Sequence, residues 1–134
     1  MANATTTTYD PNDLTTTLGG VFLTGFSEDL VEFEKDEDSN TFKVGAQGDV
    51  LVSKVNNRLA TIKVTLLATS PQNAYLDKLA ETGQVVPVSV IYNGTPKETI
   101  TSTAGVVIKP AARKYGNEAD DRVYEIKLTN YEIL

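Results

Sequence analysis

Residues 59–83, LATIKVTLLATSPQNAYLDKLAETG, join an alternating strand pattern to a short helix. In the first half of this stretch apolar side chains occupy every second position, which is the period of a strand with one buried face. Ser70 and Pro71 predict the start of the helix, because a serine hydroxyl can cap the first turn and proline lacks an N–H that would need a partner there. Gly83 is predicted to end it. The apolar positions are Ala60, Ile62, Val64, Leu66 and Ala68 in the strand, and Tyr75, Leu76, Leu79 and Ala80 in the helix.

Hairpins are predicted on both sides of this stretch, since strand-forming segments alternate with turn residues. Gly19-Gly20 is predicted to join strands 14–18 and 21–24, and the acidic tip 36–40 to join strands 30–35 and 41–46. Asn93-Gly94 predicts a third hairpin, and Pro87 places its first strand at a sheet edge. The remaining expected strands are 50–54, 85–92, 95–102, 105–109 and 122–130, the last with Tyr124, Ile126 and Leu128 on its apolar side.

Many short strands and one helix predict a mainly β fold. We expect either a β-barrel or two packed antiparallel sheets, with the α-helix on one flank. The length of 134 residues fits one domain, residues 1–134. Residues 1–10 are expected to form an N-terminal arm, because the threonine run within it cannot bury apolar surface.

Composition disfavours several classes of function. The net charge of −6 disfavours a nucleic-acid-binding module, which usually carries an excess of Lys and Arg. The sequence has no cysteine and no histidine, which excludes disulfides, thiolate metal sites and the usual serine hydrolase triad. It shows neither a secretory signal nor a membrane span, so we expect a protein made and kept in a cytoplasm. Taken together, the residue types lead us to expect no cofactor and no enzymatic activity.

Two local patterns allow chemical interpretations that the residues weaken. Asp36, Asp38 and Asn40 match the first, third and fifth positions of a calcium loop, but Thr41 and Gln47 stand where glycine and glutamate are required. A solvated or subunit-contacting tip is the better interpretation. A pair of carboxylates could also serve a glycosidase, but the chain has no tryptophan and few aromatic residues for a sugar platform. A basic cluster could bind phosphate or pair with acidic loops of a neighbour: Lys109, Arg113, Lys114 and Arg122.

Several segments resemble the tail tube proteins of contractile-tailed bacteriophages, and the resemblance extends from Tyr9 to Leu134. The segments are YDPND and LTTTLGGVFLTGF at 9–26, EDLVEFEKDEDSNTFKVG at 28–45, GAQGDVLVSKVNNRLATIKVTLLATSPQNAYLDKL at 45–79, and VIKPAARKYGNEADDRVYEI at 107–126.

The resemblance implies a non-enzymatic structural subunit that forms hexameric rings. Such rings stack head to tail into a hollow tube through which DNA passes without specific binding. It also implies contacts with the tail sheath, baseplate or initiator proteins, a tail terminator, and a tape measure protein in the lumen before DNA enters. The protein would be found in the virion tail after assembly in the bacterial host cytoplasm, with no membrane partner.

The resemblance further implies three groups of contact residues. Those of the acidic hairpin, expected to reach an adjacent ring, are Glu32, Glu34, Lys35, Asp36, Glu37, Asp38, Ser39 and Asn40. Those of the N-terminal arm are Thr5, Thr6, Thr7, Thr8 and Tyr9. Those of an outer or inter-subunit helix are Gln72, Asn73, Asp77 and Lys78.

Two alternatives stay open. One is the tube subunit of a type VI secretion-like or phage-derived contractile injection particle, which would carry different cargo. The other is a small β-barrel ligand-binding module, which predicts a monomer with an aromatic-lined pocket.

Overall fold

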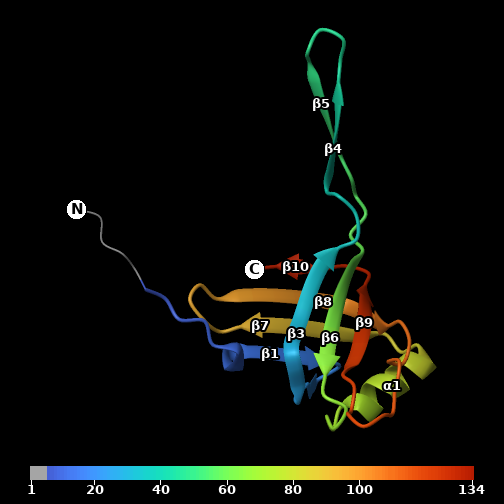
Figure 1. The fold of residues 1–134 in the computed structure, drawn as a ribbon. Helices are drawn as coiled ribbons and strands as arrows, with labels where there is room; N and C mark the ends of the chain where they lie inside the picture. The colour runs from blue at the N-terminus through green and yellow to red at the C-terminus, as the bar shows by residue number, and fades with distance from the viewer. Residues whose placement is uncertain (1–5) are drawn as a thin grey trace.

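Strand β6 (Ala60–Leu66) lies at the centre of the core in the computed structural model, which describes residues 6–134. Its side chains alternate between fully buried and half-buried along the whole strand, as predicted. Ala68 lies beyond the end of the strand. The fold is mainly β with one α-helix, which confirms the predicted class (Figure 1).

The strands around β6 form one large antiparallel sheet in the order β2-β1-β7-β8-β9-β6-β3, with β10 paired to β8. A second sheet contains β4 and β5. The elements other than β6 are the 3₁₀ turn η1 (Pro11–Asp13), β1 (Leu14–Leu18), β2 (Val21–Phe22), β3 (Phe26–Lys35), β4 (Asn40–Val44), β5 (Val50–Lys54), α1 (Asn73–Thr82), β7 (Val86–Tyr92), β8 (Glu98–Val107), β9 (Arg122–Leu128) and β10 (Glu132–Ile133).

The large sheet changes direction at Gly105. Strand β8 pairs with β7 from Glu98 to Gly105, and with β9 from Gly105 to Val107. A Cβ atom at this glycine would lie 2.6 Å from Cγ2 of Val88 in β7 and 3.2 Å from Cδ2 of Leu128 in β9, so glycine allows β8 to lie close to both neighbouring strands. As a result β3, β6 and β9 cross β1, β7 and β8 (Figure 1).

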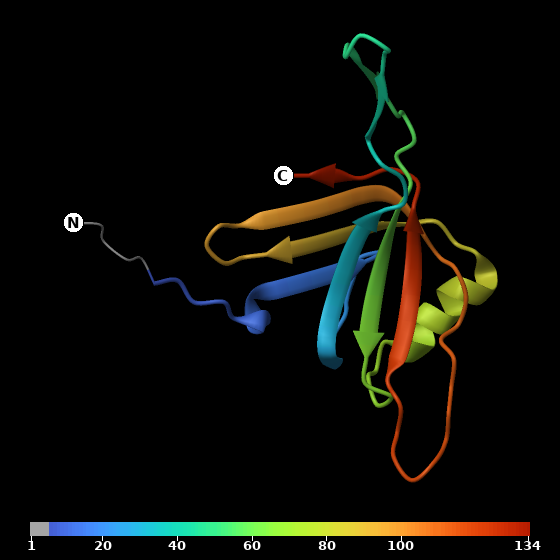
Figure 2. The same cartoon turned by 45° about the horizontal axis from the view of Figure 1, so that its top comes forward.

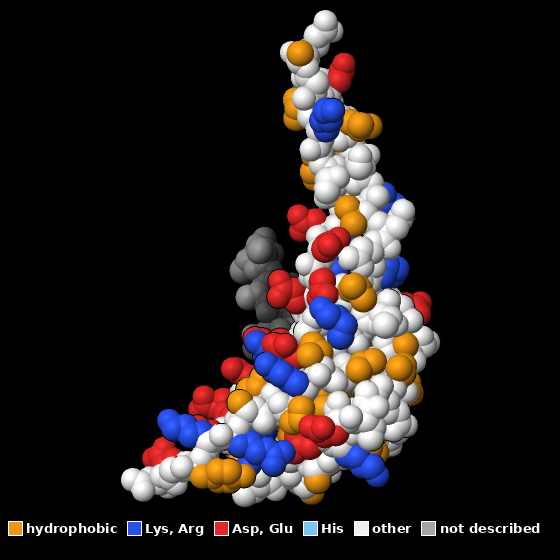
Figure 3. Space-filling view, turned by 90° about the vertical axis from the view of Figure 1, so that its right-hand side faces the viewer, with side chains coloured by type: hydrophobic (Ala, Val, Ile, Leu, Met, Phe, Trp, Pro, Cys, Tyr) orange, Lys and Arg blue, Asp and Glu red, His pale blue; other side chains and the backbone are white. Residues whose placement is uncertain are grey.

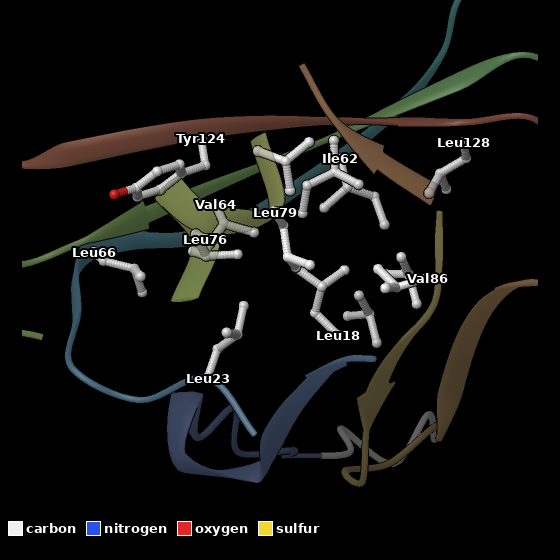
Figure 4. Packing of buried hydrophobic residues seen from close by; sticks show 14 of the residues in the cluster. Leu18, Leu23, Ile62, Val64, Leu66, Leu76, Leu79, Val86, Tyr124 and Leu128 are labelled. Atoms are coloured by element: carbon white, nitrogen blue, oxygen red, sulfur yellow. The ribbon is translucent and has the colours of Figure 1, made fainter. Parts of the chain in front are cut away.

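The core lies where the two halves of the sheet face each other. Side chains from β1, β6, β7, β9 and α1 converge there, as Figure 4 shows for Leu18, Ile62, Val86, Tyr124 and Leu79. The predicted apolar side of the last long strand is confirmed, because Tyr124, Ile126 and Leu128 are fully buried. The sheet does not close into a barrel: β2 and β3 stand at its two ends, and no described strand joins them.

Helix α1 begins later than predicted. Its first helical residue is Asn73, and its N-cap Gln72 makes no side-chain cap hydrogen bond. The Ser70 hydroxyl accepts the N–H of Gln72 at 3.4 Å and donates to the carbonyl of Thr24 at 2.6 Å, which ties the turn before the helix to the segment that follows β2. The predicted stop is confirmed: Gly83 has φ 67° and donates its N–H to the carbonyl of Leu79 at 3.0 Å.

The predicted pairing of 30–35 with 41–46 is wrong. Strand β3 pairs with β6, with Val31 opposite Val64 and Phe33 opposite Ile62. This distant partner lets Val31 and Phe33 pack against the core, which a local hairpin could not offer. Strand β4 pairs with β5 instead, so the hairpin tip is at 45–49 and not at 36–40.

The hairpin of β7 and β8 is confirmed, and the expected strands 95–102 and 105–109 form the single strand β8. The edge position predicted from Pro87 is wrong, because β7 lies between β1 and β8. The register of β7 against β8 shifts between Val86 and Val88. Because of this bulge, no ladder hydrogen bond is needed from Pro87, which has no N–H. The carbonyl of Pro87 accepts the N–H of Gly19 at 2.8 Å.

Candidate functional site

The β4–β5 hairpin projects away from the body of the domain (Figures 1 and 2). Five antiparallel pairs hold its two strands together, from Asn40 opposite Lys54 to Val44 opposite Val50. At its tip Gly45 donates to the carbonyl of Asp49 at 2.7 Å, and Gly48 has φ 94°. Every residue of both strands is exposed.

One face of this hairpin is apolar and uncovered by the rest of the described chain. Phe42 lies opposite Val52, and Val44 opposite Val50, so these four side chains share a face. They are 70%, 54%, 66% and 59% exposed, respectively. A lone two-stranded hairpin is marginally stable in water, and these side chains gain from burial by a partner. Figure 3 shows the hairpin as a narrow projection with hydrophobic side chains on its surface. We call these four residues the apolar hairpin face.

The base of the hairpin is held to the sheet by Asp36. Its carboxylate accepts hydrogen bonds from the Lys127 ammonium and, at 2.8 Å, from the Thr61 hydroxyl. The hydrogen bond from Lys127, together with the bond from Thr61, lowers the pKa of Asp36 below its usual value of 3.8. The backbone N–H of Asp36 also donates to the carbonyl of Leu59 at 3.0 Å, which joins the segment that leads into the hairpin to the segment that leads out of it.

A second anchor lies in the segment 55–59, which leads from β5 to β6. The Arg58 guanidinium donates to the Tyr131 carbonyl at 2.7 Å and lies 4.5 Å from the centre of the Tyr131 ring. That ring meets the ring of Phe33 edge to face at 5.3 Å. The base of the hairpin is therefore fixed to β6, β9 and the C-terminal segment, while the tip extends freely from the body.

The eight acidic-hairpin residues predicted as contacts occupy the approach to this projection. Glu32, Glu34 and Lys35 lie in β3, residues 36–39 connect it to β4, and Asn40 begins β4. The Lys35 ammonium donates to the Ser39 hydroxyl at 2.7 Å. Glu32 and Glu34 are exposed beside Lys63 and Glu125, whose charged groups are 4.0 Å apart. Their contact with another subunit stays a prediction.

The N-terminal arm is predicted to contact a neighbour, and the structure describes part of it. Thr5 lies outside the described residues, and Thr6, Thr7, Thr8 and Tyr9 are exposed. The Tyr9 ring lies 5.3 Å from the Tyr92 ring, which fixes the root of the arm against the end of β7.

The four predicted helix contacts differ in their surroundings. Gln72 accepts hydrogen bonds from the N–H and hydroxyl of Thr24. Asn73 is buried, and its amide donates to the carbonyls of two residues in the preceding turn. Asp77 pairs with Arg113 and accepts from the Tyr124 hydroxyl at 2.9 Å. Lys78 is exposed, so of the four side chains it is the one most available to a partner.

Burial, followed by the interaction with Asp77, raises the pKa of Tyr124 to about 12. The attraction of Asp77 also raises the pKa of Arg113. Arg113 belongs to the predicted basic cluster, and this pairing uses it to hold the 108–121 loop to α1. That loop extends from the body at the end opposite the hairpin (Figure 2).

An apolar groove lies between β3 and the ends of β1, β7 and β8. It consists of two hollows of about 500 and 150 Å³ that share the lining residues Leu14, Val31, Tyr92 and Glu98. Phe33, Val90 and Ile100 extend the apolar lining, and Tyr9 lies at the rim. The charged residues among the described lining are all carboxylates: Glu28, Asp29, Glu32 and Glu98.

The calcium interpretation gains no support from residues 6–134, where no group of three or more metal-ligating side chains is arranged to hold an ion. In the same range no helix is long and apolar enough to cross a membrane.

Sequence reasoning missed the apolar hairpin face. The signal was present, because Phe42 and Val44 alternate on one side of the 45–49 turn, as Val50 and Val52 do on the other.

Comparisons with known proteins give the fold and the family. No curated protein matches the sequence. The fold is similar to the cap of the anti-feeding prophage, a tube-terminating cap, with a TM-score of 0.68 and 10% identity over 100% of this chain and 95% of that one. It is also similar to the sheath/tube terminator of the extracellular contractile injection system PVC, with a TM-score of 0.66 and 11% identity over 98% of both chains. Residues 6–109 match the family described as bacteriophage PhiTE tail tube protein, and the chain belongs to that family.

Proposed function

We propose that this chain is the tube subunit of a phage tail, and that it forms hexameric rings that stack head to tail into a hollow conduit for DNA. The observation that carries the proposal is the apolar hairpin face, whose four side chains are each more than half exposed in the isolated chain. A projection of this kind, anchored at its base and apolar along one side, requires another molecule to cover it.

The open sheet supports lateral association. Strands β2 and β3 end the large sheet, so each has one edge without a strand neighbour in the described chain. Free edges either pair with other chains or must be protected from doing so. Because the two edges differ, edge-to-edge pairing is heterologous, and repeated pairing closes a ring when the rotation fits.

The charge of the chain fits a conduit for DNA. With a net charge of −6, the subunit as a whole repels the negatively charged DNA backbone, so DNA would pass through the tube without long-lived contacts. In this assembly the sheath would surround the tube, and baseplate and terminator proteins would bind its ends. A tape measure protein would fill the lumen before DNA, and the completed tube would belong to the virion tail after assembly in the host cytoplasm.

The experiment that tests the proposal is negative-stain electron microscopy of the purified chain at high concentration, with light scattering on the same sample. Six-fold rings or hollow tubes are expected. A chain that stays monomeric at all concentrations, including after addition of preassembled baseplates, would refute the proposal.

A second candidate is the terminator of such a tube, which the two solved structures favour because both are terminators of contractile particles. A terminator would form single rings and stop there, whereas a tube subunit would add ring upon ring. The same images distinguish the two, and the length of the particles decides. A subunit of a phage-derived injection particle would also form tubes, and the genes beside its own would identify it.

A further inference from the structure

The apolar groove is a concave surface without an occupant in the described chain. Its floor is formed by side chains from four strands, with Leu14, Val31 and Tyr92 shared between its two hollows. Leu14, Val31, Phe33 and Ile100 pack against the core with one side while lining the groove with the other. The groove is therefore an opening of the core at the seam that the unclosed sheet leaves between β3 and the β1–β7–β8 half.

The apolar hairpin face is a convex surface of matching chemistry. It ends at the base of the hairpin in Lys54, which shares the face because it lies opposite Asn40 and two residues from Val52. The hairpin carries Lys43, Lys54 and Asp49, a net charge of +1 in a chain whose total is −6.

We propose that the apolar face of the β4–β5 hairpin of one copy docks in the apolar groove of a second copy. This inference rests on the proposed function and names the surface that receives the hairpin. Apolar side chains meet apolar side chains, and the rim of the groove, with its four carboxylates, faces Lys54, the charged residue on this face of the two hairpin strands.

The geometry makes the contact intermolecular and directional. The hairpin points away from the body (Figures 1 and 2), and two anchors at its base, Asp36 with Lys127 and Arg58 with Tyr131, hold it in that direction. The docking hairpin and the groove that receives it are different surfaces of the same chain, so each docked copy still offers a free hairpin at one side or a free groove at the other. Such a heterologous contact can be repeated without limit, as growth of a tube requires.

The N-terminal arm borders the same groove. Tyr9 contributes to the rim and stacks on Tyr92 of the lining. A hairpin in the groove would therefore touch the root of the arm and Glu32 of the acidic group, so residues of two predicted contact groups would lie at one interface.

Introduced cysteines test the docking, because the chain has none of its own. Val52→Cys places a thiol on the apolar hairpin face, and Glu98→Cys places one at the groove. Leu51→Cys is the matched control, since Leu51 is 61% exposed on the opposite hairpin face and Val52 is 54% exposed. Val44→Cys serves as a second probe of the apolar face. Each hairpin variant is mixed with Glu98→Cys under mild oxidation, and peptide mass spectrometry identifies the disulfides. Wild-type protein is imaged in parallel.

We expect the disulfide from Val52→Cys or Val44→Cys to Glu98→Cys to form about tenfold or more faster than that from Leu51→Cys, since docking holds the two thiols together. Rings or tubes without this selectivity would overturn the docking and leave the proposed function standing. Selective disulfides without rings or tubes would support the docking and contradict the ring. Neither disulfides nor assemblies would overturn both.

Discussion

Replacing Phe42 by threonine separates the stability of the subunit from its assembly. Phe42 is 70% exposed and lies on the apolar hairpin face opposite Val52. Threonine keeps the strand preference of the position while it removes the aromatic surface. We therefore expect the folded subunit to be nearly unaffected, and the cost to appear when a partner would have covered the ring.

The magnitude follows from the exposed fraction. Full burial of a phenylalanine side chain stabilises by about 1.5–3 kcal/mol. Since 70% of Phe42 remains to be covered, the assembly gains roughly 1–2 kcal/mol per subunit from it. That free energy corresponds to about a 5- to 30-fold rise in the subunit concentration at which assembly begins. In the isolated subunit, a surface change of this kind alters the free energy of unfolding by about 0.5 kcal/mol or less.

The assay is a concentration series followed by light scattering and sedimentation, with urea unfolding of the dilute subunit. Leu51→Thr is the matched control, because Leu51 is 61% exposed on the other hairpin face. An unchanged assembly threshold for Phe42→Thr would refute the reasoning. So would an equal rise for both variants, since the effect would then not belong to one face.

Three further predictions concern the fold that holds the hairpin. Gly105→Ala should destabilise the subunit by about 1–3 kcal/mol in urea unfolding, because the added Cβ would lie 2.6 Å from Val88. Adding Val88→Ala should recover part of that loss, and additive losses in the double variant would contradict the packing argument. Asp36→Asn should lower the Tm at neutral pH. Because the pKa of this carboxyl is lowered in the folded protein, its bond to Lys127 contributes fully above the ordinary pKa of 3.8, so the difference from wild type should shrink below pH 3.8 and vanish once the pH falls through the lowered pKa. A difference that persists at still lower pH would assign the effect to packing. Tyr124→Phe should remove the tyrosine that ionises near pH 12 in a spectrophotometric titration. It should also cost about 1 kcal/mol of stability, since the hydroxyl donates to the Asp77 carboxylate. An unchanged titration would show that the pKa near 12 belongs to another tyrosine.

Local pattern was sufficient wherever one residue's neighbours in sequence were also its neighbours in space. The alternation in β6 and β9 predicted their buried faces, and Gly83 predicted the end of α1 through its left-handed backbone. The hairpin of β7 and β8 followed from turn residues between two alternating runs. These features depend on periods of two or 3.6 residues and on backbone conformations that few residues adopt, all of which are written in adjacent positions.

The choice of strand partner was decided by tertiary structure. Residues 30–35 could pair with the next strand along the chain or with a distant one, and the sequence by itself allowed both. Pairing with β6 is preferred because it sets Val31 and Phe33 against the core, and that gain depends on residues more than twenty-five positions away. Pro87 shows the same limit, since a bulge accommodates it inside the sheet.

The same distinction between local pattern and tertiary structure applies to the candidate site. From the sequence alone came the mainly β class, the acidic charge, the absence of histidine and cysteine, and the expectation of assembly. The tertiary structure decided which segment projects, which of its faces is apolar, and where an open seam in the sheet offers a surface to receive it. The reason is physical: a one-residue change of register exchanges the two faces of a strand, and register is set by packing against the rest of the molecule.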